Sequence, residues 1–341
     1  MTNLFIEKSH KPEDYWRGVI LYGRNAASYK FALASALLEL RPQAGTLLKL
    51  EDLAPVYARH IARHLLASPK QTTSKSSQFL EACRSFNQDG DQAKLIDATL
   101  KSGFNNVIDA FHVVGSGPIE LQFFLDQRRE HSGLRITDEF SKIIESQQIS
   151  NLPLEVEARW NLVETAWELG LSSSMLSIQH DETDGRLIAY TGAQRRKPVT
   201  SSRSALNGYQ RGKCFYCNRS ISIDEPVTAD VDHFFPHALK VTVELWEVDQ
   251  IWNLVLACRE CNRGENGKFD SIPTSELVMR LHKRNEYYIS SHHPLRETLI
   301  QQMGQTEQQR RDFLSSFYKR AQERPSKPWK PKEVELEVEI L

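Results

Sequence analysis

Two CxxC pairs constrain this chain more than any other feature of its sequence. Cys214 and Cys217 form the first pair, and Cys258 and Cys261 form the second. A CxxC turn places two thiolates on one side of a tight loop, so two such turns supply the four sulfurs of a tetrahedral structural zinc site. The segment between the pairs is longer than the roughly 15–20 residues of a simple zinc ribbon, so a further structure must be built there.

The cysteine count favours the same interpretation. Four of the five cysteines in the chain of 341 residues lie in these pairs, which leaves Cys83 alone. Five cysteines are too few for a disulfide scaffold in a chain of this length. Chance pairs or a redox CxxC are the alternatives, and the presence of two pairs disfavours both. We expect Cys83 to be a buried free thiol.

Length and composition indicate a globular protein with more than one domain. A chain of 341 residues exceeds the size at which a single hydrophobic core keeps growing. Hydrophobic residues make up 40% and charged residues 26%, a balance that excludes a disordered chain. The formal net charge of −1 excludes a wholly basic, histone-like protein. A local basic surface would still be enough to hold phosphates.

The sequence carries no export or membrane signal. Charged residues interrupt positions 1–14, where a signal peptide needs an apolar core. No window approaches the ~20 apolar residues that span a bilayer. We therefore expect a cytoplasmic protein with no membrane partner.

Hydrophobic periodicity predicts four regions and an α+β fold. Residues 1–150 are predicted to be mostly helical, with helices across 15–66 and again up to Ile108. Residues 151–204 are predicted to form an amphipathic helix, a β-hairpin at Asp184-Gly185 and a basic connecting segment. Residues 205–271 contain the CxxC pairs. Residues 272–341 are predicted to be C-terminal helices followed by a charged tail, which is either an edge strand or disordered.

The main charge asymmetry lies just before the first CxxC pair. No acidic residue occurs between Gly185 and Ile223. The basic residues of this stretch are Arg186, Arg195, Arg196, Lys197, Arg203, Arg211, Lys213 and Arg219. A charge run is usually a solvated surface, but its position beside the CxxC module favours contact with the phosphates of a nucleic acid.

A polar segment near the N-terminus has two interpretations. Arg24, Asn25 and Lys30 interrupt an otherwise apolar helical stretch. They could bind a nucleic acid, an effector or a partner, or they could be ordinary polar residues at a helix start, with Asn25 as the cap. We favour the second interpretation because capping explains the pattern without a function.

The residues between and just after the CxxC pairs combine several catalytic residue types. Asp232 and His233 are adjacent at the end of a predicted strand, and Asn253 precedes a second predicted strand. Asn262 directly follows Cys261, and Lys268 comes six residues later. Adjacent strand residues point to opposite faces, so a bend at 234–236 is needed if Asp232 and His233 are to approach one metal.

In this combination, the residues from Cys214 to about Asp270 resemble the HNH endonuclease family, in its ββα-metal form with a four-cysteine zinc. The resemblance implies that His233 is the general base that deprotonates the attacking water. It implies that Asn253 orients the imidazole. It further implies that Asp232 and Asn262 hold one catalytic Mg²⁺ or Mn²⁺, hard cations that prefer oxygen ligands.

Several nearby residues are candidates for secondary roles. Asn262 stands where many relatives have a third histidine, which moves the metal preference toward Mg²⁺. His237 and Asn266 compete for metal or phosphate roles but fit the motif spacing less well. The candidates for phosphate contact are Lys268, Arg263, Arg259, Arg211 and Lys213.

The resemblance implies a metal-dependent endonuclease that hydrolyses phosphodiester bonds in DNA, with double-stranded DNA as the favoured partner. Related modules occur in restriction enzymes and phage-defence effectors, so an antiviral role is a further expectation by analogy. In such a role the N-terminal region would sense, form a homo-oligomer or bind a partner protein of the defence system. A zinc-stabilised, non-catalytic nucleic-acid-binding protein and an RNA-directed nuclease remain open as alternatives.

Overall fold

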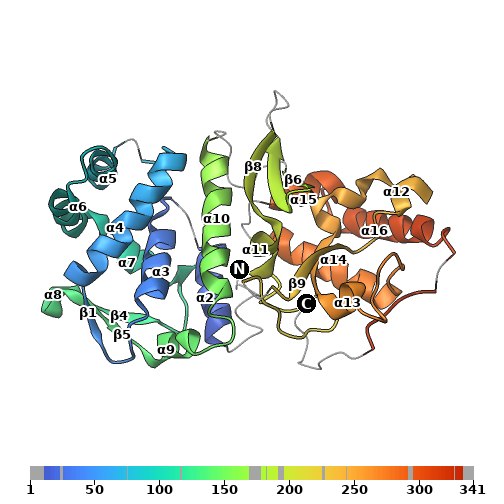
Figure 1. The fold of residues 1–341 in the computed structure, drawn as a ribbon, viewed down its shortest axis with the longest axis horizontal. Coiled ribbons are helices and arrows are strands. Elements are labelled where there is room, and N and C mark those ends of the chain that lie inside the picture. Colours follow the sequence, from blue (N-terminus) through green and yellow to red (C-terminus); the bar gives the residue numbers. More distant parts are fainter. Residues whose placement is uncertain are drawn as a thin grey trace. The chain divides into compact units, whose positions relative to one another are not determined.

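The fold is given by a computed structural model. It describes residues 11–23, 26–74, 76–115, 117–168, 178–181, 183–190, 196–224, 227–242, 244–290, 295–325 and 327–332. The chain divides into two compact units, Met1–Glu168 and Leu169–Leu341 (Figure 1). Both units combine helices with small antiparallel sheets, which confirms the predicted α+β class.

The first unit is mainly helical, as the periodicity predicts. Its helices are α2 (Pro12–Tyr22), α3 (Tyr29–Leu40), α4 (Leu50–Ala67), α5 (Gln78–Asp89), α6 (Gln92–Ala98), the π-helical turn η1 (Thr99–Gly103), α7 (Val107–Ala110), α8 (Arg128–His131), α9 (Asp138–Ile144) and α10 (Asn151–Glu168). Its strands are β1 (Leu47–Lys49), β2 (Val113–Val114), β3 (Gly117–Pro118), β4 (Phe124–Gln127) and β5 (Gly133–Ile136). A sheet in the order β1-β5-β4 and a β2-β3 hairpin were not predicted, because strands this short show no reliable alternation.

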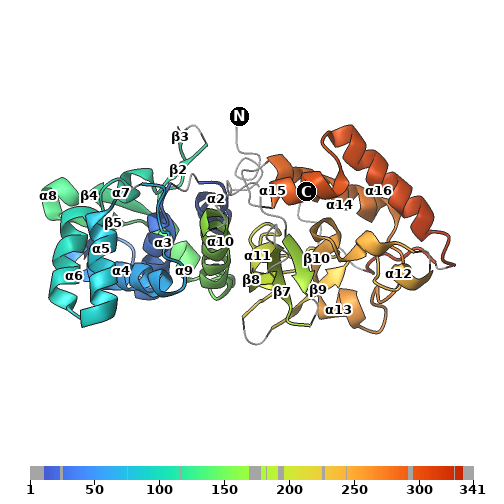
Figure 2. The same ribbon diagram turned by 90° about the horizontal axis from the view of Figure 1, so that it is seen from above.

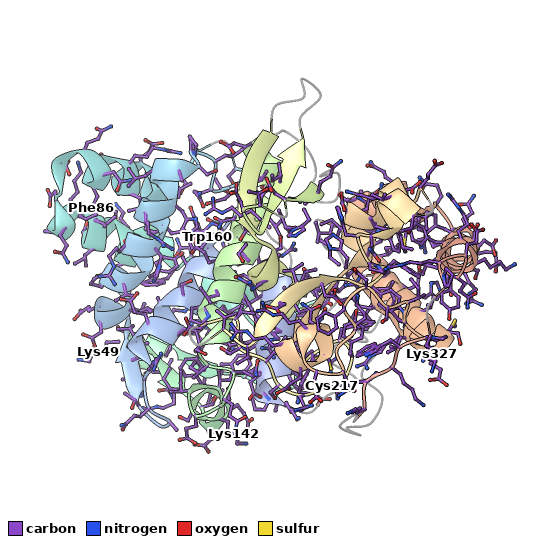
Figure 3. All side chains as sticks on the ribbon, turned by 45° about the vertical axis from the view of Figure 1, so that its right-hand side comes forward. Lys49, Phe86, Lys142, Trp160, Cys217 and Lys327 are labelled. Carbon is purple, nitrogen blue, oxygen red and sulfur yellow. The ribbon has the colours of Figure 1, made fainter. Side chains whose placement is uncertain are left out.

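Helix α10 is part of the first unit, although the sequence suggested a domain boundary near residue 150. Arg17 of α2 pairs with Glu155 of α10 at 2.8 Å, and both side chains are buried. The indole of Trp160, labelled in Figure 3, donates to Gln71 at 3.0 Å. The same indole stacks on His64, with ring centroids 3.5 Å apart. These contacts place α10 in the helical core, so the compact unit ends after Glu168.

Local sequence signals set the ends of α5 and α6. The Ser77 hydroxyl accepts from the Leu80 amide at 3.3 Å, and Asp91 caps α6 in the same way through Lys94 at 3.0 Å. Gly90 ends α5 with a φ of 71°, a left-handed conformation that glycine adopts without steric cost. Cys83 on α5 is a buried free thiol, as expected, and burial raises its pKa to about 12.

The second unit contains both CxxC pairs. Its strands are β6 (Ile178–Asp181), β7 (Arg186–Tyr190), β8 (Arg196–Ser201), β9 (Ala229–His233) and β10 (Leu254–Cys258). Its helices are α11 (Ser202–Asn207), α12 (Leu239–Thr242), the 3-10 turns η2 (Trp246–Asp249) and η3 (Ile251–Asn253), α13 (Arg259–Arg263), α14 (Ser275–Ser290), α15 (Arg296–Met303) and α16 (Glu307–Ala321). The hairpin predicted at Asp184-Gly185 is confirmed, since Asp181 pairs with Arg186. Strand β8 adds a third strand to it.

Helices α14 and α16 pack against the residues at the start of β10. Arg284 of α14 is fully buried and donates to the main-chain carbonyls of Trp252 and Leu254, which satisfies a guanidinium that would otherwise be costly to bury. Trp252 also packs edge-on against Phe313 and Phe317 of α16. Helix α14 thereby fixes the start of β10.

The predicted helices over 274–322 are confirmed as α14, α15 and α16. The predicted acidic tail, 333–341, lies outside the described residues. Within the ranges given above, no helix is long and apolar enough to cross a bilayer.

Candidate active site and metal centre

The four cysteines of the CxxC pairs form one buried cluster. Their sulfur atoms all lie within 4.8 Å of one another. The Sγ atoms of Cys217, labelled in Figure 3, and Cys258 are 3.7 Å apart. A tetrahedral zinc with Zn–S bonds of about 2.3 Å separates its sulfurs by about 3.8 Å. The predicted cluster is confirmed, and its donors and spacing fit a structural zinc ion.

Hydrogen bonds attach the first CxxC turn to β10, the strand that leads into the second turn. The amide of Phe215, inside the first turn, donates to the Leu256 carbonyl of β10 at 2.9 Å. The Gln210 side chain bonds both the amide and the carbonyl of Leu256, at 2.9 and 3.0 Å. Cys258 ends β10 and is the N-cap residue of α13, which brings Cys261 into the first helical turn.

Between the CxxC turns, β9 and β10 form the predicted antiparallel pair, and α13 follows β10 directly (Figure 2). His233 lies opposite Leu254, and Asp232 lies opposite Val255. The chain therefore contains a hairpin followed by a helix, the ββα arrangement that the resemblance predicts.

Asp232 is held in a buried polar network. The Tyr216 hydroxyl donates to one carboxylate oxygen at 2.6 Å, and the Lys268 ammonium lies 3.2 Å from the other. Lys268 is fully buried and also donates to the carbonyls of His233 and Phe269, each at 3.0 Å. Burial raises the pKa of Asp232, while Lys268 and Tyr216 oppose this rise. The network fixes the end of β9, next to His233.

His233 lies at the junction between β9 and the following bend. Its Nε2 atom is 3.7 Å from Asp249 Oδ1, and its side chain is 13% exposed. Burial lowers the pKa of His233 to about 4, with Asp249 opposing and His180 reinforcing the shift. The imidazole is therefore neutral at neutral pH, the form that can accept a proton from water.

Asn253 holds the main chain that follows His233. Its amide nitrogen donates to the carbonyls of Phe235 at 2.8 Å and Val248 at 2.7 Å. Its side-chain oxygen accepts from the Phe235 amide at 2.8 Å, and its own carbonyl accepts from Phe234 at 2.8 Å. Asn253 thus fixes the backbone of the bend that directly follows His233, and this bend lies at the positions where the sequence analysis placed one.

Asn262 contacts Asp230, a residue that the sequence analysis did not select. The Asn262 amide lies 3.2 Å from one oxygen of Asp230, and Arg263 Nε lies 2.9 Å from the same oxygen. Asp230 precedes Asp232 by two positions on β9, so the alternation of the strand gives both the same face. That alternation was the signal that could have drawn attention to Asp230.

A cavity of about 340 Å³ lies beside Asp230, His233 and Asn262. Asp230, His233, Asn262 and Arg263 line it together with His180 of β6 and Arg203 of α11. Arg203 belongs to the acid-free run, but nothing in the sequence places it beside His233. His180 was missed because its position depends on packing between distant strands.

Two of the predicted phosphate contacts are buried. Lys268 is 0% exposed and paired with Asp232, so it cannot reach a phosphate without breaking that pair. Arg211 is 6% exposed, in a left-handed turn before the first CxxC pair. These positions argue against the predicted phosphate roles of both residues. Arg259 and Arg263 are exposed, and Lys213 is half-buried.

The lower-ranked candidates lie beside the site. His237 is half exposed, with Nε2 3.7 Å from Asp249 Oδ1. The main-chain carbonyl of Asn266 accepts a hydrogen bond from the Trp329 indole at 2.9 Å, so the main chain of Asn266 has a structural role.

The carboxylate of Asp230 and the amide of Asn262 give the cavity oxygen ligands beside an imidazole, a set that fits a hard divalent cation.

Comparison with known proteins identifies the same segment. Residues 214–273 match a family model described as HNH endonuclease. This range holds all four cysteines, the β9-β10 hairpin and α13. Searches of curated proteins and of solved structures returned no significant match. The family match confirms the resemblance and supports nuclease activity of the HNH type for this part of the chain.

Proposed function

We propose that this chain is a metal-dependent endonuclease that hydrolyses phosphodiester bonds in DNA. The proposal rests above all on one observation: Asp230, His233 and Asn262, which all belong to the segment that matches the HNH family, line a single cavity. A proton acceptor and oxygen donors for a cation are the two components that hydrolysis of a phosphodiester by an activated water requires.

His233 acts as the general base. Its neutral imidazole takes a proton from the water that attacks phosphorus, and Asn253 keeps the ring in place through the bend at Phe235. Asp249, 3.7 Å from Nε2, stabilises the imidazolium that forms.

One Mg²⁺ or Mn²⁺ would be held by Asn262 and by one carboxylate of β9. The resemblance assigns Asp232 to this role, while the contact with Asn262 favours Asp230. When bound, such a cation neutralises the scissile phosphate and stabilises the leaving oxygen. Arg203, Arg259 and Arg263 contact the phosphate backbone from the rim of the cavity and from α13.

Zinc bound by the four cysteines has a structural role in this proposal. The sulfurs are buried and tie the first CxxC turn to the β10-α13 junction. A closed four-sulfur site leaves no open position for a substrate.

The test is cleavage of supercoiled plasmid by the intact protein with Mg²⁺, with and without EDTA. We expect nicking that requires Mg²⁺ and that is abolished in His233→Ala, while zinc content and melting temperature are unchanged. His131→Ala, an exposed histidine of the first unit, is the matched control and should cut like the parent. Plasmid binding without metal-dependent nicking would instead support the non-catalytic zinc protein.

The DNA substrate and the antiviral role are tested by separate experiments. Cleavage of duplex DNA and of single-stranded RNA in parallel tests the substrate, and faster RNA cleavage would overturn the DNA assignment. The antiviral role is tested by phage plating on cells that carry the parent or the His233→Ala chain. Equal plating efficiencies across a phage panel would contradict it.

A further inference from the structure

The first unit contains a cavity of about 420 Å³ that the nuclease mechanism does not use. It lies at the N-terminal ends of two helices. Tyr29 and Lys30 begin α3, and Ser77 is the N-cap of α5. The opposite wall comes from Ser102 and from Asn106 before α7. The volume falls within the range of roughly 300–1,000 Å³ typical of small-molecule sites.

Lys30 is the cationic group of this cavity, and it is almost completely buried. Its exposure is 5%, and its ammonium donates to the Val113 carbonyl at 3.2 Å. A side chain at Gly23 would come within 2.5 Å of the Lys30 Nζ atom, so glycine there leaves room for the ammonium. Within the described ranges of the chain, Lys30 makes no ion pair with a carboxylate.

Two other buried cations of the same unit are paired with carboxylates. Arg17 is bound by Glu155 at 2.8 Å, and His64 is bound by Glu164 at 2.8 Å. Burying a charge without a partner is costly. Burial accordingly lowers the pKa of Lys30 to about 8. An anion in the cavity would supply the missing counter-charge.

The surroundings of Lys30 are suited to an anion with several oxygens. Helices α3 and α5 each have 12 residues, and both point their N-terminal, partially positive ends at the cavity. Its walls carry hydroxyl and amide side chains, and no carboxylate is among the described residues that line it.

A neighbouring hollow of about 380 Å³ shares Lys30, Asn106 and Ala110 with the cavity. Asp109 is its one acidic lining residue among those described, and the rest of its lining includes Ala110 and Val113. The nearby His112 carries no charge, because burial, reinforced by Lys30, lowers its pKa to about 3. The positive charge is therefore concentrated at Lys30.

We propose that this cavity binds a small molecule carrying a phosphate group, with the phosphate on Lys30 and a body of mononucleotide size against the hydroxyl and amide walls. A phosphate offers at least three acceptor oxygens, which can take bonds from an ammonium and from serine hydroxyls together. Lys30, one of the three polar residues noted near the N-terminus, thus has a binding role in this proposal, while Arg24 and Asn25 lie outside the described residues.

The test measures the melting temperature of the intact protein in inorganic phosphate, with sodium chloride at matched ionic strength. We expect a saturable rise with phosphate that is lost in Lys30→Met. Lys94→Met, an exposed lysine of α6, is the matched control and should keep the rise. Arg263→Gln should also keep it, which separates this cavity from phosphate binding at the nuclease site. The proposal is overturned if phosphate does not raise the melting temperature of the parent, or if it raises that of Lys30→Met equally.

Lys30→Met also separates binding from a structural role. Without phosphate we expect its melting temperature to equal or exceed that of the parent, because the variant removes an unpaired buried charge. If its melting temperature falls while phosphate still binds, Lys30 is only structural and the proposal fails. Asn106→Asp gives a second, nearly isosteric variant at a left-handed position that aspartate tolerates. Its added charge should weaken phosphate binding at least tenfold.

The size of the ligand is tested with the four nucleoside 5′-monophosphates, the matching nucleosides and a single-stranded 20-mer oligonucleotide. We expect at least one monophosphate to bind at least tenfold more tightly than inorganic phosphate, and the nucleosides not to bind. If the oligonucleotide binds at Lys30 more tightly than every monophosphate, the small-molecule assignment is overturned.

Discussion

The side-chain amide of Asn262 lies 3.2 Å from the carboxylate of Asp230, which joins the first helical turn after the CxxC pair to strand β9. Asp232, two positions along the same strand, has different partners: the Tyr216 hydroxyl and the Lys268 ammonium. The two carboxylates of β9 therefore have separate environments, one beside the cavity and one buried. This difference leads to distinct expectations for their variants.

Asp230→Asn should lower Mg²⁺-dependent plasmid cleavage at least tenfold, because it removes a carboxylate from the cavity beside Asn262 and His233. Its melting temperature should stay close to that of the parent, since its partner Arg263 is largely exposed. Parental cleavage rates over a Mg²⁺ titration would contradict a role for Asp230 at the cation.

Asp232→Asn should mainly destabilise the second unit. It leaves the Lys268 ammonium fully buried without its counter-charge, and breaking a buried pair in this way costs about 3–5 kcal/mol. Urea denaturation measures this loss. The double variant Asp232→Asn/Lys268→Met removes both charges and should recover part of it. If the double variant recovers no stability, Asp232 stabilises the second unit through more than its ion pair with Lys268.

Zinc removal should unfold the cysteine module. The four sulfurs lie within 4.8 Å of one another, and without a metal the direct link between the two CxxC turns is lost and only hydrogen bonds such as that from Phe215 to Leu256 remain. Cys217→Ser should lower the zinc content measured by atomic emission and lower the melting temperature. Cys83→Ser, in α5, should keep the full zinc content, and equal zinc loss in both variants would refute the assignment.

The stability of the first unit should depend on pH through His64. Burial alone would lower the pKa of His64, but hydrogen bonds to Glu157 and Glu164 raise it overall. The contribution of His64 is therefore fully present below its unfolded pKa of about 6.5 and is lost as pH rises through the higher folded pKa. Unfolding free energies at pH 6 and pH 9 should differ more in the parent than in His64→Gln.

Glu157 should make the stability of the first unit fall at acid pH. Burial alone would raise its pKa, but His64 and Arg63 lower it to about 2. Its stabilisation is present above the unfolded pKa and is lost as pH falls toward 2. A parent whose stability changes no more than that of Glu157→Gln between pH 5 and pH 3 would contradict this assignment.

Arg203 should contribute to DNA binding by charge. Arg203→Gln should weaken binding to all sequences and reduce the slope of log affinity against log salt by about 1. Fluorescence anisotropy in the His233→Ala background without added Mg²⁺, which prevents cleavage and leaves the zinc in place, measures both quantities. Arg59→Gln, an exposed arginine of the first unit, is the control and should leave the slope unchanged. Arg211→Gln should lower stability more than affinity, because Arg211 is buried.

Much of the local structure could be predicted from residue patterns. Amphipathic spacing marked α4 and α10, and Asp184-Gly185 marked the turn between β6 and β7. The short strands β1, β4 and β5 could not be predicted, because three or four residues give no reliable periodicity. The placement of α10 with the first unit could not be predicted either, since the contacts that bind α10 to α2 join residues more than a hundred positions apart.

The sequence by itself determined the cysteine cluster and the ββα arrangement of the second unit. Two CxxC pairs specified a four-sulfur cluster, and the order of Asp232, His233, Asn253 and Asn262 specified a hairpin and helix of the HNH type. These features are readable from the sequence, since each depends on residue types and their order within residues 214–273.

Only the tertiary structure decided which charged groups are available for chemistry. Strand alternation gives Asp230 and Asp232 the same face, so no local pattern separates them. Tyr216 and Lys268, which arrive from opposite ends of the module, bury one and leave the other beside the cavity. Whether a charge is paired, buried or exposed depends on neighbours distant in the chain, and the cost of burying a charge makes that difference energetically large.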